Sequence, residues 1–259
     1  MKIVRFSVKG EVKYGVLEGD TIKCLKGEVY SLLSGGGNDK FSRDTYQLSD
    51  VKLLAPCEPS KLVCIGLNYR GHAQEVNAPL PEEPIIFLKP PTAVIGPDAE
   101  IILPRVSRKV DYEGELGVVI GKRAKDVPED RALEYVLGYM CVNDVSERYY
   151  QKLDGQWTRA KGFDTFAPIG PWIVTGISGD DLKLETYLNG EVRQSSRTSD
   201  LIFGISALVS FVSVVMTLLP GDVISTGTPS GIGQINAGDV VEVRIENIGT
   251  LRNPVVAQS

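Results

Sequence analysis

A buried β-strand is predicted by the run Asp111-Tyr112-Glu113-Gly114-Glu115-Leu116-Gly117-Val118-Val119-Ile120, which decides the fold of this chain. Residues i and i+2 of a strand point to the same face, so the carboxylates of Glu113 and Glu115 lie side by side. Unpaired carboxylates in a core cost on the order of several kcal/mol, unless a cation compensates them. The simpler interpretation is a polar face on an edge strand, and the Glu-x-Glu spacing alone leaves both interpretations open.

A third carboxylate, Asp144, closes a second apolar run, Gly138-Tyr139-Met140-Cys141-Val142-Asn143. Three oxygen donors with no Cys or His beside them suit Mg²⁺ or Mn²⁺, and also Ca²⁺, better than Zn²⁺. The sequence therefore indicates a divalent-metal site formed by Glu113, Glu115 and Asp144.

The chain contains one histidine, His72, and Glu75 follows it three residues later. If these residues form a helical turn, the carboxylate lies beside the imidazole, fixes its tautomer and raises its basicity. Such a pair can take a proton from water or from a substrate carbon. A surface histidine beside a solvated glutamate is the simpler interpretation.

Three further segments carry candidate binding groups. A short helical stretch after Asp144 places Arg148 and Gln151 on one side, and arginine is suited to binding a carboxylate. Lys161 stands between aromatic residues, although a solvated loop lysine explains it equally simply. The segment 225–233 is rich in Gly, Ser and Thr, and its N–H groups and hydroxyls could cradle an anion, although a plain Gly-Pro turn is the alternative.

Bulk composition excludes several classes of partner. The 259 residues carry a formal net charge of −5 and are 42% hydrophobic, as in a globular protein without a basic footprint, so neither nucleic acid nor anionic membranes are expected as partners. The four cysteines show no CxxC pairing, and the N-terminus lacks an apolar signal region. We expect free thiols and a cytoplasmic location.

The segment 201–219 contains no charged residue, and it is long enough to span a membrane. However, Ser206, Ser210, Ser213 and Thr217 form one polar stripe of a helix. We therefore expect a helix buried inside the domain or at a subunit interface.

The chain divides into a small N-terminal β domain, residues 1–58, and a catalytic domain, residues 59–259. The first contains alternating apolar residues and a glycine-rich loop at 34–39. In the second, Asn189-Gly190 predicts a β-hairpin, and a helix is expected from Pro128 to Gly138. Because regular βαβ alternation is absent, the fold class is α+β, mainly mixed β-sheets.

The order of these motifs along residues 60 to 254 is distinctive. Gly-x-Asn-Tyr with His72 and Glu75 precedes Asp-Tyr-Glu-x-Glu-Leu, then Asn-Asp-Val, then Trp-Thr-x-Ala-Lys-Gly-Phe-Asp, then Thr-Gly-Thr-Pro-x-Gly. This order resembles the fumarylacetoacetate hydrolase family. The resemblance implies a rolled, barrel-like mixed-sheet fold, a homodimer, and Mg²⁺ or Mn²⁺ bound by Glu113, Glu115 and Asp144. One departure is Tyr149-Tyr150, where relatives often have an Asp and an aliphatic residue, and it leaves the acyl-side specificity open.

The resemblance also implies the roles of the other residues. His72 and Glu75 are the acid/base dyad, Lys161 stabilises developing negative charge, and Arg148, Gln151 and Thr228 bind the substrate. The implied activity is metal-dependent hydrolysis of a C–C bond in acylpyruvate-type 2,4-dioxo acids through a pyruvate enolate. The alternatives are isomerisation of 2-hydroxyhepta-2,4-diene-1,7-dioate or decarboxylation of a 2-oxo diacid, and, more remotely, a non-catalytic binding protein. The substrate, the pathway and the metal are left open.

Overall fold

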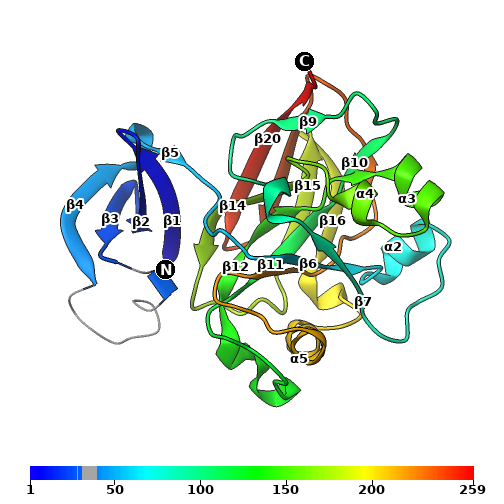
Figure 1. The fold of residues 1–259 in the computed structure, drawn as a ribbon, viewed down its shortest axis with the longest axis horizontal. Helices are drawn as coiled ribbons and strands as arrows, with labels where there is room; N and C mark the ends of the chain where they lie inside the picture. Colours follow the sequence, from blue (N-terminus) through cyan, green and yellow to red (C-terminus); the bar gives the residue numbers. More distant parts are fainter. Residues whose placement is uncertain (28, 31–39) are drawn as a thin grey trace.

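A computed structural model describes every residue of the chain except 28 and 31–39, so the predicted loop at 34–39 lies outside the described residues. The described part is mainly β-sheet with a few short helices, which confirms the α+β prediction (Figure 1). The described α-helices are α2 (Arg70–Glu75), α3 (Arg148–Asp154), α4 (Thr158–Lys161) and α5 (Ile205–Val215). The 3-10 helices are η1 (Leu48–Asp50), η2 (Pro91–Ala93), η4 (Thr198–Asp200) and the longer η3 (Glu129–Tyr135).

The largest sheet runs through the whole molecule in the order β4-β3-β2-β1-β14-β12-β11-β17-β6-β7, with β5 beside β1 and β8 beside β14. Because β4 and β7 are its two edges, the pairing of the described strands does not close it into a barrel. Its strands are β1 (Lys2–Val8), β2 (Glu11–Glu18), β3 (Thr21–Leu25), β4 (Phe41–Gln47), β5 (Lys52–Leu53), β6 (Leu62–Gly66), β7 (Ile85–Lys89), β8 (Val94–Ile95), β11 (Gly114–Ile120), β12 (Val136–Asn143), β14 (Ala167–Val174) and β17 (Val223–Ser225).

Two smaller sheets complete the fold. A three-stranded sheet has the order β13-β10-β18, and a five-stranded sheet has the order β16-β15-β19-β20-β9. Their strands are β9 (Ile101–Leu103), β10 (Val110–Tyr112), β13 (Ser146–Glu147), β15 (Lys183–Leu188), β16 (Glu191–Arg197), β18 (Gly233–Gln234), β19 (Val240–Ile245) and β20 (Gly249–Ala257). The hairpin between β15 and β16 turns at Asn189-Gly190 as predicted, with both residues at positive φ.

The N-terminal strands β1 to β4 form the lobe at the left of Figure 1. They join the rest of the molecule through β1, which pairs antiparallel with β14 (Ile3 opposite Ile173). We keep the division into domains at residue 58 as a proposal.

The core fills both faces of the large sheet. On one face, Leu116 and Val118 of β11 pack with Val243 of β19 and with Leu208 and Val212 of α5. On the other face, the side chains of Val119, Met140 and Val142 alternate out of the same strands and pack with Cys64. Since β11 and β12 are covered on both sides, polar side chains at their ends are held in fixed positions.

Two predicted helices differ from the structure. The segment 129–135 forms 3-10 helix, and Gly138 lies inside β12 instead of ending a helix, because the apolar residues that follow pair with β11. The charge-free segment 201–219 contains an α-helix of only 11 residues. Its hydroxyl stripe is used inside the protein, where Ser213 Oγ accepts from the N–H of Val127 at 2.8 Å and Ser210 Oγ donates to the carbonyl of Val127 at 2.8 Å. Among the described helices, none is long and apolar enough to cross a membrane.

Candidate active site

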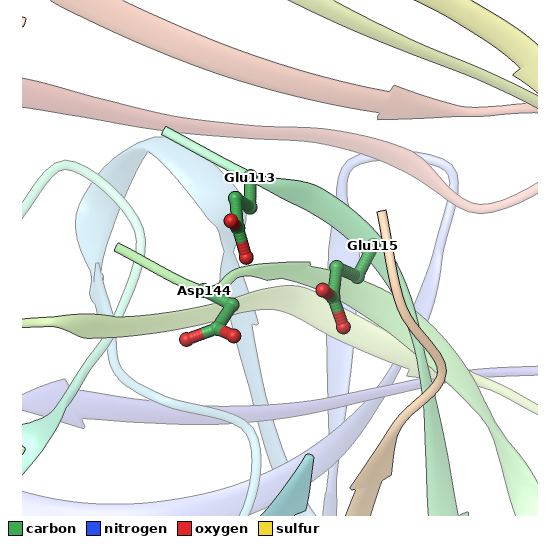
Figure 2. Close-up of side chains that lie close together, drawn as sticks. All are labelled: Glu113, Glu115 and Asp144. Atoms are coloured by element: carbon green, nitrogen blue, oxygen red, sulfur yellow. The ribbon is translucent and has the colours of Figure 1, made fainter. Parts of the chain in front are cut away.

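Three carboxylates converge where two neighbouring core strands end (Figure 2). Glu113 lies between β10 and β11, Glu115 lies in β11, and Asp144 directly follows β12. All three are buried, and one oxygen of each lies within 4.8 Å of the others. The strand ends are tied together, since the N–H of Asp144 donates to the carbonyl of Glu113 at 2.8 Å.

The edge-strand interpretation of the two glutamates is wrong. β11 lies between β12 and β17 in the middle of the large sheet. Its break at Glu113 still leaves both carboxylates pointing toward Asp144 (Figure 2).

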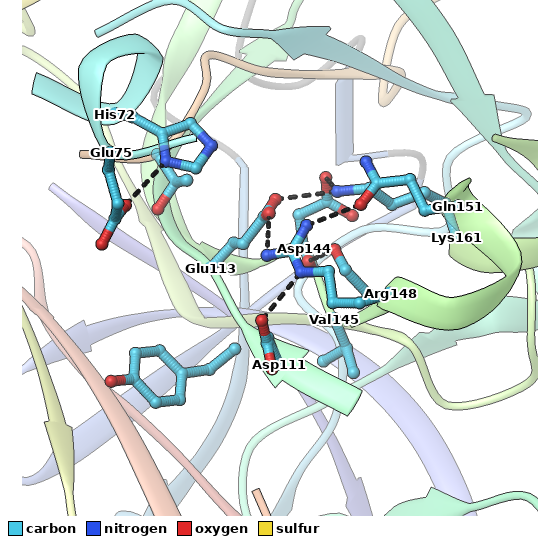
Figure 3. A network of polar contacts seen from close by, with 12 residues as sticks. His72, Glu75, Asp111, Glu113, Asp144, Val145, Arg148, Gln151 and Lys161 are labelled. Carbon is cyan, nitrogen blue, oxygen red and sulfur yellow. Dashed lines mark hydrogen bonds and ion pairs between the residues drawn. The ribbon is translucent and has the colours of Figure 1, made fainter. Parts of the chain in front are cut away.

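Three cations contact this acidic cluster: Lys89 and Lys161, which are buried, and Arg148, which is partly buried. Figure 3 shows Arg148 and Lys161 beside Glu113. Lys161 Nζ donates to Glu113 at 2.8 Å and to Asp144 at 2.6 Å. Arg148 donates to Glu113 at 2.5 Å and to Asp111 at 2.8 Å. Lys89 Nζ donates to the other Asp144 oxygen at 2.5 Å. Lys161 is therefore a buried ion-pair partner, and the solvated-loop interpretation is wrong.

These contacts compensate the carboxylates unequally. Burial raises the pKa of Glu113, but the Lys161 and Arg148 charges outweigh it and hold that pKa well below its ordinary value. Burial, together with the negative charges of Asp144 and Glu113, raises the pKa of Glu115 to about 8. Glu115 contacts no cationic group among the described residues, because its Oε2 accepts only from the Ser225 hydroxyl at 2.6 Å and the Gly227 N–H at 2.9 Å.

The donor set fits a divalent cation. Lys89, Arg148 and Lys161 pair with Asp111, Glu113 and Asp144, whereas Glu115 has no ion-pair partner among the described residues, so its ionised form is the one that lacks a compensating cation. Buried charge of this kind is stabilised by a bound cation, and all-oxygen donors suit a hard one.

The Gly- and Thr-rich segment after β17 serves the same cluster. The anion that its N–H and hydroxyl groups hold is the Glu115 carboxylate of the protein itself. Thr228 Oγ1 donates to the carbonyl of Gly114 at 2.9 Å and accepts from Gln194 Nε2 at 2.7 Å. The plain-turn interpretation of this segment is therefore wrong.

The predicted dyad is formed on α2. His72 Nδ1 lies 3.0 Å from Glu75 Oε2, and the other Glu75 oxygen accepts from the N–H of Gly231 at 2.9 Å. His72 is only 6% exposed, so the surface interpretation is wrong. The carboxylate of Glu75 is thus fixed on two sides and fixes the imidazole in turn.

One cavity of about 790 Å³ brings these groups together. All nine candidate residues from the sequence line it: His72, Glu75, Glu113, Glu115, Asp144, Arg148, Gln151, Lys161 and Thr228. Its apolar lining includes Ile65, Phe87 and Trp157.

Sequence reasoning missed Lys89, Asp111 and Gln194, which are buried and support the candidate residues. Lys89 ends an apolar strand and is followed by two prolines. Asp111 precedes the Glu-x-Glu motif by two residues. A charged residue at the end of a predicted strand could therefore have indicated both. Gln194 stands in a polar, exposed strand that gives no such signal.

Comparison with known proteins agrees with the fold. The profile of the fumarylacetoacetate (FAA) hydrolase C-terminal family matches residues 61–256, and the profile of the N-terminal region of Rv2993c-like proteins matches residues 1–56. The chain therefore belongs to the fumarylacetoacetate hydrolase family. Members of this family are enzymes that act on small-molecule acids, and they include hydrolases and isomerases.

Similar curated proteins come from archaea and bacteria. An uncharacterised protein of Archaeoglobus fulgidus is 59% identical over 209 residues, which cover 81% of this chain and 84% of that protein. A 2,4-didehydro-3-deoxy-L-rhamnonate hydrolase of Sphingomonas is 42% identical over an alignment that covers 98% of this chain and 96% of that protein.

Solved structures share the whole fold. A 5-carboxymethyl-2-hydroxymuconate delta-isomerase from Mycobacterium smegmatis is 48% identical, with a TM-score of 0.92 and full coverage of both chains. A maleylpyruvate hydrolase from Sphingobium, solved in complex with manganese(II) and pyruvate, is 29% identical, with a TM-score of 0.81 and full coverage of both chains.

Proposed function

We propose that this protein is a divalent-metal-dependent hydrolase that cleaves a C–C bond of acylpyruvate-type 2,4-dioxo acids. The observation that carries the proposal is that three buried carboxylates and the His72–Glu75 dyad line the same cavity. Two relatives support it by name, since a maleylpyruvate hydrolase shares the fold and a 2,4-didehydro-3-deoxy-L-rhamnonate hydrolase is 42% identical over 98% of this chain.

In this proposal Glu113, Glu115 and Asp144 hold Mg²⁺ or Mn²⁺. The ion, when bound, supplies a Lewis acid for the 1-carboxylate and 2-oxo oxygens of the substrate. Arg148 and Gln151 orient the substrate carboxylate. Arg148 is fixed by Asp111 and Glu113 and donates to Gln151 Oε1 at 2.9 Å, which leaves the Gln151 N–H groups without a partner among the described residues.

The dyad activates water for attack on the C4 carbonyl. His72 takes a proton from the water, and Glu75 stabilises the resulting imidazolium. The water oxygen bonds to C4, the C3–C4 bond breaks, and its electron pair passes to C3 as a pyruvate enolate. The acyl part leaves as a carboxylic acid, and protonation of C3 completes pyruvate. Lys161 shares the negative charge of the enolate, because burial lowers the pKa of its ammonium but Asp144 and Glu113 raise it above its usual range.

The second candidate is an isomerase of hydroxy-dienoic diacids or a decarboxylase of 2-oxo diacids. The similarity to the M. smegmatis delta-isomerase favours it, since that structure covers the whole chain at 48% identity. These reactions also develop negative charge on an enolate, so the divalent ion and Lys161 would stabilise that charge in the same way.

A direct assay separates the candidates. Purified protein is mixed with acetylpyruvate, fumarylpyruvate, oxaloacetate and a hydroxymuconate-type diacid, each with Mg²⁺, with Mn²⁺ and with EDTA. The proposal expects metal-dependent formation of pyruvate and a carboxylic acid from an acylpyruvate. Isomerisation or CO₂ release without acylpyruvate cleavage would contradict it in favour of the second candidate, and no turnover of any substrate would favour a binding protein.

A further inference from the structure

Trp157 is a large aromatic side chain that lines the cavity without joining the core. It is half-buried, and it belongs to none of the hydrophobic clusters that the described residues form in the core. It lines the cavity of the candidate active site instead. A tryptophan in this position offers a large apolar contact area to a ligand in the cavity.

Two ring contacts connect Trp157 to the acidic cluster. The Lys161 ammonium, which belongs to the ion pairs of that cluster, lies 4.9 Å from the centroid of the Phe87 ring. The rings of Phe87 and Trp157 meet edge to face, with their centroids 5.2 Å apart. Because both rings line the cavity, they form one aromatic surface that begins beside the acidic cluster and continues to Trp157.

The backbone fixes this aromatic surface in relation to Lys161. Trp157 directly precedes α4, and its carbonyl accepts from the N–H of Lys161 at 3.0 Å, so one helical turn carries both the indole ring and the ammonium. At the end of β6, Gly66 leaves room for the indole ring, since a Cβ there would lie 2.7 Å from Trp157 Cζ3 and 2.9 Å from Cη2. The glycine therefore lets the ring pack closely against the end of this strand.

We infer that Trp157 binds the carbon chain of the substrate beyond its 2-oxo acid end, and that it selects for the length of this chain. The inference rests on the proposed function, which places the 2-oxo acid end at the acidic cluster. A chain that runs along the Phe87–Trp157 surface gains apolar contact with each added carbon, whereas pyruvate gains none. The substrate class is therefore a 2,4-dioxo acid whose acyl group contains an extended apolar segment, and acetylpyruvate and oxaloacetate are poor substrates.

Ligands that cannot be cleaved test the inference by binding alone. Titration calorimetry of the Mg²⁺-loaded protein measures Kd for pyruvate, 2-oxobutanoate, 2-oxopentanoate, 2-oxohexanoate and 2-oxoheptanoate, which differ only in the number of methylene groups. Complete burial of one methylene group is worth about fourfold in affinity. We therefore expect 2-oxohexanoate to bind at least about tenfold more tightly than pyruvate.

Two substitutions locate this preference. Trp157→Ala removes the ring but keeps the backbone carbonyl that contacts Lys161, and it should reduce the ratio of the two affinities to nearly one. Trp172→Phe is the matched control, because the second tryptophan of the chain does not line the cavity, and it should leave the ratio unchanged. Thermal unfolding of each variant shows whether the fold is retained.

Tryptophan fluorescence reports the contact directly and without turnover. In Trp172→Phe only Trp157 remains, and its emission should change when 2-oxohexanoate binds. In Trp157→Phe only Trp172 remains, and its emission should stay constant at the same degree of binding. If Trp172→Phe does not fold, the unmutated protein and Trp157→Phe provide the same comparison.

The possible outcomes separate this inference from the proposed function. An affinity that does not depend on chain length, or an absence of binding by any of these 2-oxo acids, would overturn the inference, whereas cleavage of acylpyruvates would still support the hydrolase proposal. An equal loss for all ligands in Trp157→Ala, or an undiminished preference for long chains, would overturn the assignment to Trp157. A preference for long chains in a protein that cleaves no acylpyruvate would support the inference and contradict the hydrolase proposal.

Discussion

Glu115 and Glu147 are both buried glutamates that accept hydrogen bonds without a cationic partner, yet their oxygens are used differently. Both hydrogen bonds to Glu115 reach one oxygen, so the other faces Glu113 and Asp144. The bonds to Glu147 use both oxygens. An amide can replace the first carboxylate without losing a bond, but it cannot replace the second.

We predict that Glu115→Gln removes metal binding without unfolding the protein. One anionic donor becomes neutral, so Mn²⁺ affinity should fall by more than the roughly 10- to 100-fold that loss of a supporting partner costs. At pH 9, above the raised pKa of Glu115, the metal-free variant should be at least as stable as the unmutated protein, because a repulsive buried charge is removed. Titration calorimetry and thermal unfolding measure the two quantities.

Glu147→Gln is the control for that experiment. Its new NH₂ group would face a backbone N–H, so we expect a loss of about 1–3 kcal/mol in unfolding free energy with Mn²⁺ affinity retained. Unchanged Mn²⁺ affinity in Glu115→Gln would show that Glu115 is not a ligand.

His72 should matter for hydrolysis more than for decarboxylation. Hydrolysis needs a base for water, whereas loss of CO₂ from a 2-oxo diacid mainly needs an electron sink. His72→Ala should therefore reduce acylpyruvate cleavage by roughly 10²–10⁴-fold, and any oxaloacetate decarboxylation much less. Lys161→Met should reduce both, because both develop enolate charge. Parallel initial-rate assays would refute this division of roles if His72→Ala lowered the two activities equally.

At the scale of elements, the sequence predicts the residues that line the site better than the residues that hold them in place. Glu113, Glu115, His72 and Glu75 are close in sequence, so strand and helix periodicity alone places each pair correctly. Asp144 meets Glu113 and Glu115 only because β12 pairs with β11. The resemblance implied that the three residues share a metal site, but periodicity could not show the strand pairing that brings them together. Gln194 reaches Thr228 across 34 residues from a polar strand, and no local pattern reveals such a contact.

Tertiary pairing overrode local propensity at one predicted helix, 128–138, and shortened another, which is present as α5 within 201–219. Gly138 looked like the end of a helix, but Val174 of the neighbouring strand lies so close to it that a side chain would clash, so this glycine serves strand packing. The charge-free segment 201–219 ends its helix at Val215, before Leu218 pairs with Ala124.

All four thiols are buried, three of them in strands and that of Cys57 between β5 and β6, and this burial predicts how they react. Burial raises the pKa of Cys57 and of Cys141 to about 12, that of Cys64 well above its usual range, and that of Cys24 to a smaller extent. Since the thiolate is the reactive form, the native protein should react slowly with an aromatic disulfide reagent at pH 8, and the protein unfolded in guanidinium should release four equivalents at once.

The same raised pKa values predict that the folded protein loses stability as pH rises into the alkaline range. A raised pKa in the folded state means that the native protein holds these protons more tightly. The resulting stabilisation is complete below the pKa of the unfolded thiols and is lost as pH rises toward about 12. The midpoint of thermal unfolding should therefore fall through this range, and replacing Cys141 with Ala should make the fall less steep. A native thiol that reacts rapidly at pH 8 would contradict the burial on which this prediction depends.

At the scale of the whole molecule, some of the exposed large apolar residues lie on α5, on η3, which packs against it, and just after α5. Val214 and Val215 are 60% and 57% exposed there, and Leu133 and Leu219 are exposed beside them. An exposed apolar cluster of this kind is typical of an interface. We therefore predict a homodimer that buries this surface, with a sedimentation mass near twice 28.2 kDa in dilute buffer.

A charge placed on this surface should dissociate the dimer. Val214→Asp would bury an unpaired carboxylate in the interface, which costs several kcal/mol, roughly, so the variant should sediment as a folded monomer. Val192→Asp is the control, because Val192 is 49% exposed on strand β16 and not on α5 or η3. This change should leave the sedimentation mass of the dimer unaltered. Since the candidate residues all belong to one chain's cavity, the monomeric variant should keep its Mn²⁺ affinity. A Val214→Asp protein that remains dimeric would place the interface elsewhere, and loss of Mn²⁺ binding on dissociation would show that the cavity depends on the second copy.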